Sequence, residues 1–167
     1  TSGVRSMREM FSGCSLLLEL DMRSFDTSNV VDMCKMFEGC SSLRMIDLGN
    51  FDLSKVTNMK GMFEGCASLK EINFGQLNFL QKCIDTGKMF SGCNNLESIV
   101  TYNCPEEIMQ MFLDLLAEAG LEDTEVHSFD AQIFTVMICP HCGKEHPDTT
   151  KFCPETGKPM PTITWIC

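Results

Sequence analysis

A repeat of 26 residues occupies the first hundred residues, and it constrains the fold more than any other feature. Met-Phe pairs recur with a spacing of 26, 26 and then 27 residues, and Gly-Cys pairs keep the same spacing. The Gly-Cys pairs are Gly13-Cys14, Gly39-Cys40, Gly65-Cys66 and Gly92-Cys93. Because one short unit cannot bury its own apolar face, such a period predicts a stack of similar coils.

Each unit predicts one strand and one short helix. Apolar residues after each Gly-Cys pair follow an L-x-x-L-x-L-like pattern that ends in the alternation of a strand. These positions are Leu17, Leu20 and Met22; Leu43, Ile46 and Leu48; Leu69, Ile72 and Phe74; and Leu96 and Ile99. The preceding stretch "SNVVDMCKMF" spaces its apolar residues at helical intervals, and Gly39 then suits a left-handed cap. The predicted fold class is α/β, a solenoid with a parallel sheet on one side and short helices on the other.

Two features depart from the regular repeat, one in the third unit and one at the start of the sequence. The third unit, "FGQLNFLQKCIDTGKMF", has one extra residue, which predicts a local bulge near residues 81–86. The opening "TSGVRSMREMF" aligns with "TSNVVDMCKMF" from Thr27, so the chain begins within a coil and without methionine. We therefore expect that these residues are a trimmed piece of a longer protein.

The repeat text resembles the leucine-rich repeats of bacterial BspA-type surface proteins. The matching signature is "MFxGCxSLxxLDLxxFDTSNVxxM", found at residues 10–33 and 36–59. The resemblance covers about 100 of the 167 residues. It implies a bacterial leucine-rich-repeat solenoid and an exported, cell-surface location.

The solvent-facing strand positions form the candidate binding face. They are Leu18, Glu19, Asp21, Arg44, Met45, Asp47, Lys70, Glu71 and Asn73. Their mixed charge suits a protein partner better than a phosphate-bearing one, and a glycan is a second option. We therefore predict a monomeric, non-catalytic binding or scaffold module whose partner is unknown.

The chain has 11 cysteines, an odd and high number. Cys14, Cys40, Cys66 and Cys93 are equivalent, which predicts a ladder of buried free thiols. Disulfides between adjacent coils, about 4.8 Å apart, are the alternative. The irregularly placed Cys34, Cys83 and Cys104 are predicted to fill core or boundary space, and Met10, Met36, Met62 and Met89 to lie in the core.

A helix is predicted after the repeats, over residues 105–119, "PEEIMQMFLDLLAEA", with Gly120 as its stop. Its apolar stripe is Ile108, Met111, Phe112, Leu115 and Leu116. The stripe predicts a cap over the last coil, with a helix that docks on a partner as the alternative. "LEDTEVHSFD" is predicted to be a loop or linker, and "AQIFTVMIC" and "PTITWIC" to be strands. The predicted domains are residues 1–104, 105–124 and 125–167.

The last segment predicts a small β zinc ribbon with structural Zn²⁺. "CPHCGKEHPDTTKFCPETGK" resembles the short zinc ribbons of many bacterial proteins, but Thr156 stands where a fourth cysteine is expected. Structural zinc needs four thiolate or imidazole ligands. Cys139, Cys142 and Cys153 supply three, and His146 is the predicted fourth. Cys167 and His141 are the other candidates.

Two further functions compete with the binding module. The Cys3His segment suggests a nucleic-acid-binding or regulatory protein, and "CPHC" alone is the active-site text of thiol-disulfide oxidoreductases. Such redox cysteines stand at a helix start, whereas Gly143 follows here at once.

Charge and motifs narrow these options. Net charge is −10, and residues 105–138 hold eight acidic side chains and no Lys or Arg, which disfavours nucleic acid. The sequence lacks a run of about 18 apolar residues, which a membrane span needs. It also lacks hydrolase, zinc-protease and phosphate-loop motifs. Localisation is ambiguous, since thiolate-bound zinc and free thiols favour a reducing cytoplasm whereas the family resemblance favours export.

Overall fold

The computed structural model describes residues 3–77, 84–129, 137–138 and 145–146. It divides the chain into two units, Thr1–Phe129 and Asp130–Cys167. The sequence placed a boundary at residue 125 instead, because it did not recognise the strand that ends the first unit.

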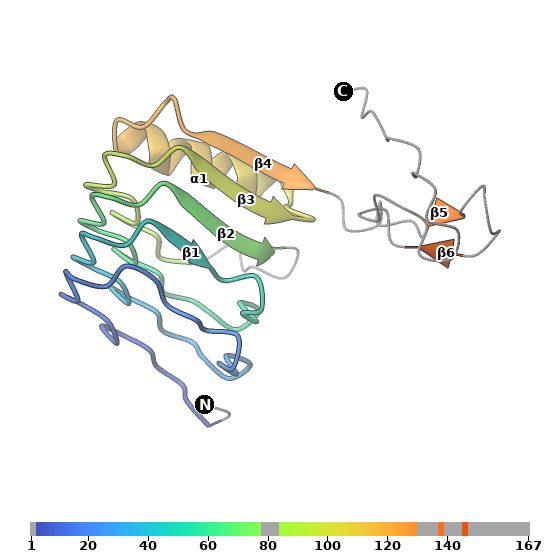
Figure 1. The fold of residues 1–167 in the computed structure, drawn as a ribbon, viewed down its shortest axis with the longest axis horizontal. Helices are drawn as coiled ribbons and strands as arrows, with labels where there is room; N and C mark the ends of the chain where they lie inside the picture. The colour runs from blue at the N-terminus through green and yellow to red at the C-terminus, as the bar shows by residue number, and fades with distance from the viewer. Residues whose placement is uncertain (1–2, 78–83, 130–136, 139–144, 147–167) are drawn as a thin grey trace, which may run out of the picture. The chain divides into compact units, whose positions relative to one another are not determined.

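The first unit contains a parallel sheet in the order β1-β2-β3-β4 (Figure 1). The strands are β1 (Met45–Asp47), β2 (Glu71–Gln76), β3 (Ser98–Tyr102) and β4 (Glu125–Phe129). Ile46 pairs with Ile72, and Ile72 with Ile99, so the equivalent apolar residues of successive repeats stand side by side. The predicted parallel sheet and mixed α/β class are therefore confirmed.

The strand predicted for the first repeat does not form, since residues 19–21 lie outside the sheet. Leu20 is only half-buried, whereas its equivalents Ile46 and Ile72 are buried. A buried face is what fixes the register of a strand. Among the described residues, the first repeat has such cover on one side only.

The short helices predicted before each Gly-Cys pair are wrong, because these segments consist of turns. Lys35 and Gly39 both have left-handed backbone, with φ of 57° and 71°, so no right-handed helix can pass through them. The amides of Lys35 and Phe37 donate to carbonyls of the next repeat, at Lys60 and Met62, both at 2.9 Å. The intervening Met36 amide donates only three residues back. Alternate amides thus join the coils to each other.

The register of the sheet shifts between Asn73 and Gly75, where β2 faces β3. Gly75 has φ of +67°, and a Cβ atom there would lie 2.7 Å from the Cα atom of Gly49. Glycine at position 75 therefore permits two backbones to approach closely. Half of the predicted bulge at residues 81–86, residues 81–83, falls outside the described residues.

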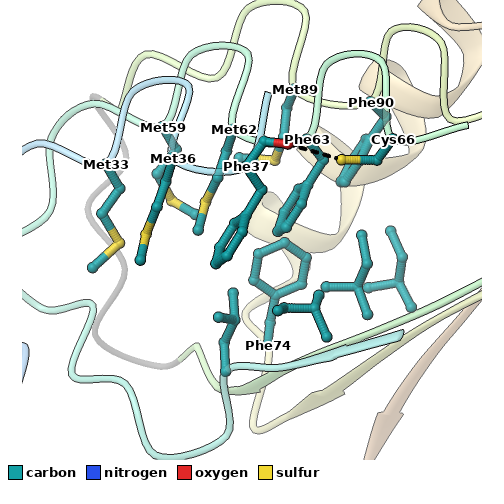
Figure 2. Close-up of a cluster of buried hydrophobic side chains, with 14 of the residues drawn as sticks. Met33, Met36, Phe37, Met59, Met62, Phe63, Cys66, Phe74, Met89 and Phe90 are labelled. Carbon is teal, nitrogen blue, oxygen red and sulfur yellow. Dashed lines mark hydrogen bonds between the residues drawn. The ribbon is translucent and has the colours of Figure 1, made fainter. Parts of the chain in front are cut away.

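The core lies between the sheet and the turns, in rows of identical side chains (Figure 2). Phe37 stacks on Phe11 and on Phe63, with ring centroids 5.5 and 5.7 Å apart. Met36, Met62 and Met89 are buried as predicted, but the prediction for Met10 is wrong. Met10 is 46% exposed because no other described residues cover the outer side of the first repeat.

The helix α1 (Glu106–Glu118) follows β3 and packs on the core. Phe112 lies 5.0 Å from Phe74 and 6.1 Å from Phe90 between ring centroids. Ile108 and Leu116 are also buried. The predicted apolar stripe therefore packs on the coils, and the alternative of a helix that docks on a partner does not apply.

The loop predicted over residues 121–130 is confirmed for residues 121–124, which form a turn, but it is wrong for Glu125–Phe129, where β4 extends the sheet beyond the helix. Val126 pairs with Ile99, which continues the inward row of the repeats. The helix therefore connects two parallel strands, as in a β-α-β unit.

In the second unit, β5 (Met137–Ile138) pairs antiparallel with β6 (Glu145–His146). β5 coincides with part of the strand predicted from "AQIFTVMIC". The strand predicted at residues 161–167 lies outside the described residues.

Candidate functional site: the outer face of the parallel sheet

The predicted face is exposed to solvent. Eight of its nine residues are exposed, and Asn73 is half-buried. A shallow hollow of about 480 Å³ lies on this face. Its lining consists of Leu18, Glu19, Arg44, Met45, Lys70, Glu71, Glu97 and Ser98. Six of the predicted residues thus meet at one hollow, and Asp21, Asp47 and Asn73 do not line it.

Sequence reasoning missed Glu97 and Ser98. They occupy the positions of Lys70 and Glu71 one period later, as the pairing of Glu71 with Ser98 confirms. The signal was therefore present in the 27-residue spacing of the last two repeats.

Polar contacts between repeats hold side chains on this face. The Lys70 ammonium forms an ion pair with Glu97, and Asn73 Nδ2 donates to Asp47 Oδ1 at 2.9 Å. Both contacts span one period, so they fix neighbouring repeats relative to each other. Asp47 Oδ1 also accepts from the Gly49 amide at 2.8 Å, which holds its carboxylate at the end of β1.

The first repeat carries a charge pair of its own. The Arg23 guanidinium donates to Asp21 Oδ2 at 2.7 Å. Hydrogen bonds from the Arg23 side chain and amide lower the pKa of the Asp21 carboxyl to about 2. Both groups are exposed, so this pair sets local charge without contributing much stability.

A cluster of rings lies at the β3–β4 side of the same face. Tyr102 and Phe129 are cross-strand partners with ring centroids 5.8 Å apart. The His127 ring stacks on Phe129 at 6.3 Å, and His127 Nε2 lies 3.1 Å from Glu125 Oε2. Sequence analysis missed this cluster because it predicted a loop there. The available signal was the position of Val126 in "EVHSF", since it pairs with Ile99 and continues the inward row.

The equivalent cysteines are free, and three of the four are buried, as the ladder predicts. Each buried thiol donates to a carbonyl of the preceding repeat: Cys40 to Phe11 at 3.2 Å, Cys66 to Phe37 and Cys93 to Phe63, both at 3.1 Å. The Cys66 contact is the dashed line in Figure 2.

Burial raises the pKa of the Cys40 thiol to about 11 and that of Cys93 to about 12. These thiols are therefore structural and poorly nucleophilic. Cys14, in contrast, is exposed. Cys34 is buried and Cys104 half-buried, whereas Cys83 lies outside the described residues.

The predicted zinc ligands fall almost entirely outside the described residues. The described part of the chain contains no group of three or more His, Cys, Asp or Glu side chains that could hold a metal. Only the backbone of His146 is described, in β6, and Cys139 and Cys142 belong to the six residues that join β5 to β6. Cys153, His141 and Cys167 lie outside. Three thiolates and an imidazole nevertheless fit the donor preference of structural zinc.

Within the part of the chain that the structure covers, no helix is long and apolar enough to cross a membrane.

Comparison with known proteins finds one matching family model within each of the two units. The family model described as "Mycoplasma protein of unknown function, DUF285" matches residues 1–103. A zinc-ribbon domain matches residues 138–155, which supports zinc binding by the second unit. No curated protein and no solved structure matches the chain.

Proposed function

Because this chain belongs to the family described as Mycoplasma protein of unknown function, DUF285, we propose that its first unit is a leucine-rich-repeat solenoid that binds a protein partner through the outer face of the sheet. The observation that supports this most is the hollow, to which three successive repeats each contribute two residues of the predicted face. A site assembled from several repeats is how stacked coils form extended binding surfaces.

The composition of the hollow suits a protein partner. Leu18 and Met45 are 57% and 53% exposed, and they lie among charged side chains. Protein interfaces combine apolar anchors of this kind with a polar rim. A phosphate-binding surface would instead need clustered Lys and Arg, whereas Arg44 and Lys70 share this hollow with three glutamates.

We further propose that the module is not an enzyme. The carboxylates of the hollow lie on an open surface, whereas acid–base catalysis requires groups positioned in a water-excluding site. The three buried thiols of the ladder, Cys40, Cys66 and Cys93, face the core, and burial raises the pKa of each. They are therefore unsuited to nucleophilic chemistry.

A site-specific photo-crosslinker tests the proposal. The crosslinker is placed at Met45 in the full chain, which is expressed in its native host. It is expected to yield one discrete adduct with a partner protein, and the substitution Leu18→Asp should abolish this adduct. The matched control is Val31, which is 40% exposed but lies outside the sheet. Equal crosslinking from both positions, or persistence of the adduct in Leu18→Asp, would contradict the proposal.

For the second unit, we propose that one structural Zn²⁺ is held by Cys139, Cys142, Cys153 and His146. The match to a zinc-ribbon domain supports the metal, and the lack of a cysteine at Thr156 supports the histidine. The zinc would bind and stabilise a segment too short to build a large core. A site with four protein ligands has no open position for catalysis.

Zinc content by mass spectrometry tests the ligand set. The wild type should carry one equivalent, His146→Ala should lose it, and Cys167→Ala and His141→Ala should keep it. Unchanged zinc affinity in His146→Ala would show that another residue completes the site.

A further inference from the structure

The rings of Tyr102, His127 and Phe129 form a cluster on the outer face of the sheet. Phe129 is 52% exposed, and the His127 side chain is 45% exposed. The register places Tyr102 opposite Phe129 and Val100 opposite His127, so the rings stand on two neighbouring strands. Their contacts fix them as one ring surface open to solvent, and an exposed aromatic surface of this kind suits a ligand that stacks.

The carboxylate of Glu125 lies beside the ring cluster. Glu125 is 73% exposed at its side chain and contacts His127 Nε2. The same register places Glu71, Ser98 and Glu125 in one row across three strands. In total, the four strands contain Asp47, Glu71 and Glu125 but no Lys or Arg. Arg44 and Lys70 lie at the hollow on the same face, so the negative charge beside the rings is that of Glu125, and this carboxylate is complementary to a positively charged group.

We propose that Tyr102, His127, Phe129 and Glu125 bind an arginine side chain of the protein partner that docks on the sheet face. The planar guanidinium stacks on the Phe129 and His127 rings and donates to the Glu125 carboxylate. Ring faces attract cations, most often arginine, and the guanidinium can stack and bond a carboxylate at once. Lysine has a compact, strongly hydrated charge and fits the rings less well. This inference rests on the proposed function and specifies the chemistry of the partner.

An NMR titration of the full-length protein tests the proposal. The probe is a seven-residue Gly-Ser peptide with one central arginine, and the signals are those of the Tyr102 and His127 rings. The expected result is saturable shifts with the arginine peptide. The same peptide with citrulline, a neutral isostere, should bind at least tenfold more weakly, and the lysine peptide several-fold more weakly.

Substitutions in the cluster test whether the arginine peptide binds at these residues. Phe129→Leu and Glu125→Gln should each weaken arginine binding at least fivefold. Leu113→Ala, at a position 44% exposed on α1, is the control and should bind as the wild type does. Equal binding of the citrulline peptide, unchanged binding by Phe129→Leu, preference for a neutral hexose, or no shifts with any peptide would overturn the proposal.

The outcomes separate the two proposals. Crosslinking at Met45 without arginine binding would refute the arginine site and leave the docking face intact. Arginine binding without crosslinking at Met45 would refute the docking face alone.

Discussion

The first repeat and the two that follow share one sequence motif but not one environment. Phe37 and Phe63 are buried, whereas the equivalent Phe11 is half-buried. Cys40 is buried and Cys14 exposed. In the part of the chain that the structure describes, each of the two later repeats is covered on both sides and the first on one side only. The comparison shows that a repeat motif specifies which side chains point inward, while the neighbouring coils decide whether these side chains are buried.

The largest expected effect is the loss of a ring from the middle of the stack. Phe63→Ala should lower the free energy of unfolding by about 3–5 kcal/mol, because it removes a fully buried ring and leaves a cavity. Phe11→Ala should cost less than half as much, since part of its surface already contacts water. Denaturant unfolding followed by circular dichroism measures both, and equal losses would contradict the comparison.

A second test compares two left-handed glycines. Gly75→Ala should destabilise the protein by roughly 2–4 kcal/mol, since left-handed backbone and contact with Gly49 both oppose a side chain. Gly13 has φ of +74°, but a Cβ atom added there would meet nothing within 4 Å, so Gly13→Ala should cost only about 1 kcal/mol. Thermal unfolding distinguishes the two, and similar midpoint shifts would argue against close packing at Gly75.

The thiols provide a chemical test. At pH 8, iodoacetamide should modify Cys14 rapidly in the folded protein, with Cys40, Cys66 and Cys93 protected. With its pKa raised to about 12, Cys93 holds roughly two-thousandfold less thiolate at pH 8 than an unfolded cysteine of pKa near 8.5. Peptide mass mapping after short exposure reads out each site. Modification of Cys93 as fast as Cys14 would contradict the buried ladder.

The same raised pKa values predict the pH dependence of stability. The unfolded chain loses its thiol protons first, so the contribution is complete below a pH of about 8.5 and is lost as the pH rises toward 11–12. Denaturant titrations at pH 8 and pH 10 should show this loss. The loss of stability between pH 8 and pH 10 should be smaller in the double variant Cys40→Ala/Cys93→Ala, and an equal loss in this variant and the wild type would contradict the prediction.

The smallest effect concerns the surface ion pair between Lys70 and Glu97. Both side chains are more than half exposed, so Lys70→Ala should change the free energy of unfolding by about 0.5 kcal/mol or less. A double-mutant cycle with Glu97→Ala, at low and high salt, measures the coupling. A coupling above about 1 kcal/mol would show that contacts between repeats on this face contribute more to stability than exposed ion pairs usually do.

The helix error has a physical cause. Turns with two left-handed residues four positions apart, as at Lys35 and Gly39, space their apolar side chains at nearly the interval of an α-helix. Apolar spacing therefore could not separate the two. In these turns alternate amides donate to the next coil, whereas in an α-helix all amides donate along the chain. Which of the two forms depends on the neighbouring repeat.

The sequence by itself determined the repeat, the inward row of apolar residues, the thiol ladder and most of the hollow, because each follows from a period that pairs equivalent residues. Only the tertiary structure decided which members of each row are buried and that Glu125–Phe129 forms a fourth strand. The sequence of that strand does not carry the motif of the 26-residue repeat, and its pairing with β3 depends on α1 packing on the core. The ring cluster at Tyr102 and Phe129 forms only once this pairing exists.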